Sequence, residues 1–162
     1  MKFLTITSQS ELNKAISDGI TKIHVKGKWD TLFIKNGWFL HYLNISGIVK
    51  NIKVGEVVVR NHKLTYPVKP ATINNMTIKS CSLVENVFID GVIKNVLSIN
   101  TKLERLDVNY KAFVESVEIH GDTPTSLCFG MRAYGNGNPS PVGHVYIDQE
   151  VNHSNDWSSG GA

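Results

Sequence analysis

Residues 73–119, INNMTIKSCSLVENVFIDGVIKNVLSINTKLERLDVNYKAFVESVEI, give the strongest indication of the fold because one short pattern recurs in them. The pattern is apolar, any, polar, apolar, any, apolar, and its first copy runs from Ile73 to Ile78. Later copies start at Val84, Ile93, Leu103 and Val114, which are 11, 9, 10 and 11 residues apart. Each unit is too short for a helical hairpin and fits one short strand followed by a turn.

The same pattern extends outward in both directions. Further copies occupy residues 20–25, 40–45, 49–54 and 142–147. Short strands that turn every ten residues or so build a solenoid, in which each coil buries its inward side chains against its neighbours. We therefore predict an all-β protein, a short parallel β-helix (solenoid) in which two or three units complete one coil. We expect residues 1–150 to form a single domain and residues 151–162 to form a flexible tail.

An antiparallel β-sandwich is the alternative fold. It would require tight two-residue hairpins between successive strands, and Asp-Gly or Asn-Gly pairs are their usual signal. Asp90-Gly91 lies at a boundary between units, whereas Asn36-Gly37 lies in an irregular segment. The scarcity of such pairs favours the solenoid.

Asparagine occupies the polar position of four copies, at Asn51, Asn75, Asn86 and Asn95. Asparagine tolerates the left-handed backbone region, so we expect these residues at bends between strands. Stacked in successive coils, their side chains can also form a hydrogen-bonded ladder.

The N-terminus predicts a capping helix over about residues 8–18. Ser8 and Glu11 form a capping box, and Gly19 is the expected stop. Residues 8–27, SQSELNKAISDGITKIHVKG, resemble the N-terminal cap of right-handed parallel β-helix proteins of the pectate-lyase type. They are also similar to small bacteriophage-encoded β-helical proteins. The resemblance implies a fold and is nearly silent about activity.

Two segments interrupt the repeat. Residues 63–72 contain Pro67 and Pro70, which cannot donate to a strand ladder, so we expect an excursion from the stack. Residues 121–141 are rich in glycine and proline and are expected to form a long loop.

Aromatic and arginine side chains are common anchors of protein interfaces, so we predict a partner-binding surface. Its residues are Phe129, Met131, Arg132 and Tyr134 of the loop, with Phe88 and Leu97 at outward positions of the repeat.

Composition and charge narrow the function classes. The chain has 162 residues, and residues 1–81 hold twelve Lys/Arg and four Asp/Glu, a net charge of +8. Residues 82–162 hold five and ten, a net charge of −5. The basic half leaves direct nucleic-acid binding open, but it lacks the dense clusters with interleaved aromatics that would favour it. With no apolar run of membrane-spanning length, no signal peptide and only Cys81 and Cys128, we expect a cytoplasmic protein that does not bind membranes.

The resemblance makes a polysaccharide lyase the first enzyme to test. Glu85, Glu104 and Glu115 share one position of the repeat and could form a carboxylate stripe. Because lysines occupy the same position in other units, at Lys50 and Lys94, we interpret this stripe as a solvated face. No other catalytic or metal-binding motif is evident, so we predict no enzyme activity, no metal and no cofactor.

The sequence therefore favours non-enzymatic protein binding as the function. By resemblance, the partner is a host protein or protein–nucleic-acid complex, which a phage- or mobile-element-encoded solenoid occludes, as an anti-CRISPR or other anti-defence inhibitor does. The alternative is a virion tail-fibre or spike component that binds glycans, and a small polysaccharide lyase or hydrolase ranks below it. The oligomeric state separates the first two, because fibre β-helices usually trimerise.

Overall fold

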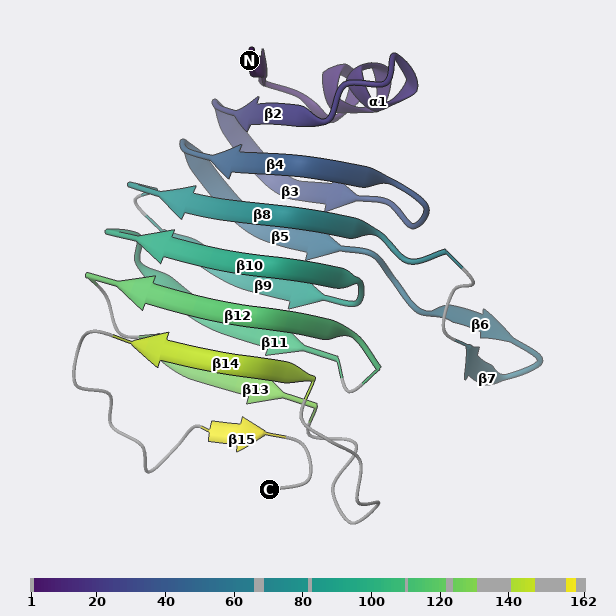
Figure 1. Ribbon diagram of the computed structural model, residues 1–162, viewed down its shortest axis with the longest axis vertical. Coiled ribbons are helices and arrows are strands. Elements are labelled where there is room, and N and C mark those ends of the chain that lie inside the picture. The colour runs from purple at the N-terminus through teal and green to yellow at the C-terminus, as the bar shows by residue number, and fades with distance from the viewer. Residues whose placement is uncertain are drawn as a thin grey trace.

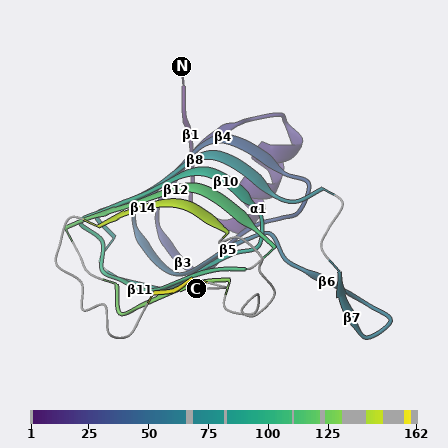
Figure 2. The same ribbon diagram turned by 60° about the horizontal axis from the view of Figure 1, so that its bottom comes forward.

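The structure is a computed structural model that describes residues 2–65, 69–81, 83–109, 111–121, 124–130, 141–147 and 157–159. Within these ranges the chain forms a short parallel β-solenoid with one helix at its N-terminal end, as Figure 1 shows. Two parallel sheets face each other across the core, and Figure 2 shows them nearly edge-on. The predicted all-β solenoid is confirmed, and the antiparallel sandwich is wrong.

Each coil consists of two strands, one from each sheet. Sheet A contains, in spatial order, β1 (Leu4–Ile6), β2 (Lys22–Val25), β4 (Phe39–Ile45), β8 (Thr72–Lys79), β10 (Val92–Ile99), β12 (Phe113–His120) and β14 (Val142–Ile147). Sheet B contains β3 (Lys28–Ile34), β5 (Ile48–Val54), β9 (Val84–Ile89), β11 (Leu103–Val108), β13 (Ser126–Phe129) and β15 (Trp157–Ser159). The chain passes from sheet A to sheet B and back, so five two-strand coils stack in chain order ahead of β14.

The repeated apolar positions form the core. In sheet A, Leu43 pairs with Met76, Met76 with Val96, and Val96 with Val117, and all four side chains are buried. Like positions therefore stack on like positions from coil to coil. Burying an aliphatic side chain of this size stabilises a fold by about 1.5–3 kcal/mol, so this column is a main source of stability.

A bend in the strands explains why the first two apolar positions of the repeat are three residues apart. In β5, Val49 and Ile52 are buried, whereas Lys50 and Asn51 between them both face outward. The pairing between β3 and β5 is interrupted at the same position: Val49 pairs with Trp29 and Asn51 with Thr31, and the register passes over the residue between them in each strand. Two consecutive outward residues reverse the ordinary alternation of a strand, which puts the first apolar residue back inside.

The predicted asparagine ladder is confirmed in both sheets. In sheet B, Asn86 Nδ2 donates to Asn51 Oδ1 at 2.8 Å, and Asn51 Nδ2 donates to the Asp30 carbonyl at 3.1 Å. In sheet A, Asn95 Nδ2 donates to Asn75 Oδ1 at 3.1 Å. These amides cross-link neighbouring coils through their side chains.

The expected left-handed backbone at the ladder asparagines is wrong. They lie within strands, and positive φ occurs instead at the turn that joins sheet A to sheet B. That turn has positive φ in each of the five coils, at Gly27, Gly47, Ser80, Asn100 and Gly121. The chain turns sharply here, so the left-handed region is needed at the corner and not at the bend in the strand.

The N-terminal cap is confirmed. Helix α1 (Gln9–Ser17) begins after Ser8, whose side chain accepts from the Glu11 amide, and it buries Leu12 and Ala15 against the first coil. The Glu11 carboxylate accepts from the Thr7 amide at 2.9 Å, and this bond lowers the pKa of Glu11. Gln9 fastens the helix to sheet B, because its side chain donates to the Phe33 carbonyl and accepts from the Phe33 amide.

The excursion between β5 and β8 contains an antiparallel hairpin, β6 (Val58–Arg60) and β7 (Lys63–Thr65), that projects from the stack (Figure 2). Asn61 and His62 have φ of 51° and 63°, as a two-residue turn with both residues left-handed requires.

The other predicted interruption is only partly correct. Residues 126–129, expected within a long loop, form β13, and residues 157–159 of the expected flexible tail form β15 beside it. Leu127 and Phe129 are buried, so core packing outweighs the turn-forming residues around them. Residues 122, 123 and 131–140, and most of 151–162, lie outside the described residues.

Candidate functional site

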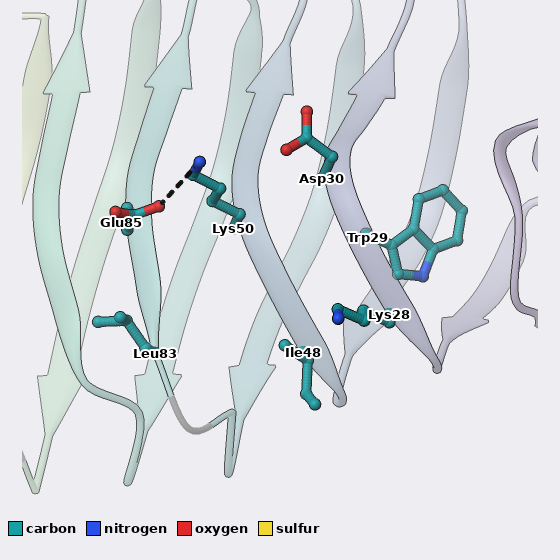
Figure 3. Close-up of a pocket in the computed structure, with 7 residues that line it drawn as sticks. All are labelled: Lys28, Trp29, Asp30, Ile48, Lys50, Leu83 and Glu85. Carbon is teal, nitrogen blue, oxygen red and sulfur yellow. Dashed lines mark ion pairs between the residues drawn. The ribbon is translucent and has the colours of Figure 1, made fainter.

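A groove lies on the outer face of sheet B, over the first three coils. Its volume is about 390 Å³, and Figure 3 shows the side chains that line it. They come from the beginnings of β3 and β5 and from the start of β9 with the residue before it: Lys28, Trp29, Asp30, Ile48, Lys50, Leu83 and Glu85. The groove is therefore assembled by the stacking of residues that are distant in sequence.

The strand bend positions the apolar residues of the groove. Since Val49 faces the core, Ile48 immediately before it faces outward, and its side chain is 55% exposed. Leu83 stands in the same relation to the buried Val84 of β9 and is half-buried. Lys28 pairs with Ile48 in the neighbouring coil, so these side chains form a short outward column (Figure 3).

Trp29 forms the inner wall at the N-terminal side. Its ring is buried with the core, and the indole Nε1 donates to the Lys26 carbonyl at 2.8 Å. The ring is fixed at both its apolar face and its polar edge, so this wall is rigid.

Charged side chains of both signs border Ile48 and Leu83. Lys50 Nζ lies 3.8 Å from Glu85 Oε2, and Asp30 lies on the next strand (Figure 3). Both side chains of the pair are partly exposed, so the ion pair contributes little stability, about 0–1 kcal/mol. With Lys28, the groove has two positively and two negatively charged groups, so neither sign of charge predominates in it.

This arrangement is suited to binding. An apolar centre within a polar border is the usual anatomy of a protein interface. Among the described residues, no group of three His, Cys, Asp or Glu is placed to hold a metal ion. Asp90, whose pKa is raised by burial, accepts a hydrogen bond from Asn109 Nδ2 at 2.8 Å and belongs to a corner of the stack outside the groove.

The structure separates the residues predicted to bind a partner. Phe129 lies in β13 and is 1% exposed, so it is a core side chain and presents no contact surface. Phe88 belongs to sheet B and Leu97 to sheet A, so the two face opposite sides of the solenoid and form no common patch. Met131, Arg132 and Tyr134 lie outside the described residues.

Phe88 is itself partly covered by side chains of neighbouring coils. It pairs with Lys53 on one side and Asp107 on the other, and the Arg105 guanidinium lies 5.8 Å from its ring centroid. Arg105 also pairs with Asp107 at 2.9 Å.

The carboxylates that share a repeat position do not form one stripe. Glu85 and Glu104 lie on sheet B, whereas Glu115 lies on sheet A, because alternate units belong to opposite sheets. Glu85 is paired with a lysine, as the interpretation of a solvated, mixed-charge face expects.

Sequence reasoning missed the apolar part of the groove, although a signal was present. An extra apolar residue precedes several repeat units, as in Ile48-Val49 and Leu83-Val84. The second residue of each pair begins the buried pattern, so the first has to face outward. The same signal marks Phe39 and Phe113 of sheet A, which are each 47% exposed.

Comparison with protein-family models, curated proteins and solved structures finds no match for this chain. In the part of the chain that the structure describes, no helix has the length and apolar character needed to cross a membrane.

Proposed function

We propose that this solenoid is a protein-binding module whose groove on sheet B receives an apolar side chain of a partner protein. The observation that carries the proposal is Ile48, a large aliphatic side chain that is 55% exposed and lies beside the charged residues of the groove (Figure 3). The bend in β5 exposes this apolar side chain to water, and a partner that covers it gains free energy of binding from the burial of apolar surface.

The shape of the site supports a protein partner. The groove extends across three coils, and its neighbouring charges of both signs suit a partner surface that also carries both. Opposite charges across an interface fix the register of the partner more than they raise the affinity. The finer proposal, that the partner belongs to a host machine that the solenoid occludes, depends only on the resemblance to small bacteriophage proteins.

The test is retention of a partner by the immobilised full-length chain from a bacterial lysate, with Ile48→Asp as the groove variant. Phe113→Asp is the matched control, because Phe113 is similarly exposed on the opposite sheet. We expect a protein that the wild type and Phe113→Asp retain and that Ile48→Asp does not.

Circular dichroism of both variants checks that each remains folded. Equal retention of every captured protein by all three chains would refute the groove as the binding site. Loss of retention in Phe113→Asp alone would move the site to sheet A.

A further inference from the structure

A second recess lies on the other side of the same corner of the solenoid, at the ends of β2, β4 and β8. Its volume is about 410 Å³, at the small end of the range for small-molecule sites. Its lining comes from three successive coils, and all but one of the residues carry a polar group: His24, Lys26, Asn44, Ile45, Ser46, Thr77, Lys79 and Ser80.

The stacking register brings these groups together. His24 pairs with Asn44, and Asn44 with Thr77, so the three form one outward column on sheet A. Lys26 and Lys79 each follow the last inward residue of their strand, and Ser46 holds the same position between them. The recess thus has an ammonium group at each end and a hydroxyl in the middle.

Every lining residue except Ile45 has a side-chain donor, and none carries a negative charge. Two ammonium groups, three hydroxyls, one amide and one imidazole line the recess, and it contains no carboxylate. His24 Nε2 lies 3.1 Å from Ser46 Oγ, which orients the imidazole toward the middle of the column. A site with many donors and excess positive charge is complementary to an oxyanion with several acceptor oxygens.

The backbone conformation of Ser80 is an independent indication that the recess is a functional site. It has φ of 56° at the corner position where three of the five coils use glycine and one uses asparagine. A serine there is strained by comparison with glycine, and such strain is concentrated at functional sites. What serine adds is a hydroxyl that lines the recess.

We propose that this recess binds a small organic phosphate, a phosphomonoester whose dianion lies between Lys26 and Lys79. A phosphomonoester carries close to two negative charges at neutral pH, which matches the two lysines. Asn44 and Thr77 are then available to the organic part of the ligand. The recess is separate from the groove on sheet B, so this inference does not depend on the proposed protein partner.

His24 provides a readout inside the recess. Burial first, and then the positive charge of Lys26, lower its pKa from the ordinary value of 6.5, so the unliganded imidazole is neutral at pH 7. The residues paired with it in the adjacent strands, Thr5 and Asn44, are uncharged, and the charged groups of the lining are Lys26 and Lys79. A bound dianion stabilises the imidazolium form and raises the pKa of His24.

The experiment titrates the full-length chain with adenosine monophosphate, inorganic phosphate, adenosine and a short single-stranded oligonucleotide. Binding is measured by calorimetry, and the His24 imidazole is followed by NMR. We expect saturable binding of adenosine monophosphate and phosphate, no binding of adenosine, and a rise in the pKa of His24 on saturation.

The double variant Lys26→Gln/Lys79→Gln should weaken binding by about tenfold or more, because each lysine supplies a charge-assisted contact. Lys94→Gln/Lys102→Gln is the matched control, since it removes two exposed lysines outside the recess. Equal weakening in both variants, no saturable phosphate binding, or binding of the oligonucleotide alone would each overturn the proposal.

Discussion

Two isoleucines of β5 provide the sharpest test of the bend in the strands. Ile48 and Ile52 are four residues apart, and a regular strand would place both side chains on the same face. In the structure Ile52 is fully buried and Ile48 is 55% exposed, because Lys50 and Asn51 both face outward between them. The same substitution at the two positions should therefore have very different effects on stability.

Ile52→Ala removes buried methyl and methylene groups and leaves a cavity. Changes of this kind cost about 2–5 kcal/mol of unfolding free energy, a large share of the 5–15 kcal/mol typical of a whole domain. Ile48→Ala removes groups that are already half in water, and its cost should stay below about 1 kcal/mol. For a chain of this length, each kcal/mol lowers Tm by roughly 2–4 °C.

The assay is urea unfolding followed by tryptophan fluorescence and circular dichroism, with Tm as a second measure. The expected result is a loss at Ile52 that exceeds the loss at Ile48 by at least about 1 kcal/mol. Equal losses, or a larger loss for Ile48→Ala, would refute the bend and with it the outward position of Ile48 in the groove.

Three further predictions concern the turns and the ladder. Gly47→Ala should be about 1–3 kcal/mol less stable than Gly37→Ala in urea unfolding. Both glycines have positive φ, but of the two only Gly47 has a close neighbour for the new Cβ, the Gly27 carbonyl oxygen at 2.6 Å. Equal losses of stability in the two variants would contradict the close packing of the corner. Asn86→Ala removes the 2.8 Å bond to Asn51 and should lower the unfolding free energy by about 0.5–1.5 kcal/mol, and no loss would argue against a stabilising ladder. Burial raises the pKa of Asp90 above its ordinary 3.8, so the folded state retains the proton more strongly than the unfolded state, and ionisation lowers stability as the pH rises through the folded-state value. Asp90→Asn lacks this loss, so its stability relative to wild type should improve from about pH 3 to about pH 7, and a constant difference in urea unfolding would refute the assignment.

Local patterns predicted the fold well because a solenoid is built from contacts between equivalent positions. The units beginning at Ile73 and Val84 each specify one strand with the same inward residues, whichever coil they join. Trp29 begins a further unit, through Leu32 and Ile34, that fits the same pattern and forms β3. β13 was harder to detect, since Leu127 and Phe129 keep only the second half of the pattern.

The candidate sites were much less predictable. The pairing of Leu43 with Met76 spans 33 positions, whereas Ile23 pairs with Leu43 across 20, because the β6–β7 excursion is inserted between the second and third coils. Sequence spacing alone therefore does not reveal which surface residues become neighbours. Phe88 and Leu97 illustrate the point, since they are nine residues apart and lie on opposite faces.

The strand repeat, the inward residues of each unit and the capping helix can all be predicted from the amino-acid sequence, since they follow from local periodicity and a local capping motif. The closure of each coil by two strands, which makes alternate units face opposite sides, emerges only when the chain is folded. That closure places Ile48 beside Leu83 and Lys26 near Lys79, and so creates the groove and the recess. Each strand buries its own apolar side, so its inward residues can be identified from that strand alone. The neighbours of an outward residue, in contrast, depend on how many residues each intervening coil contains.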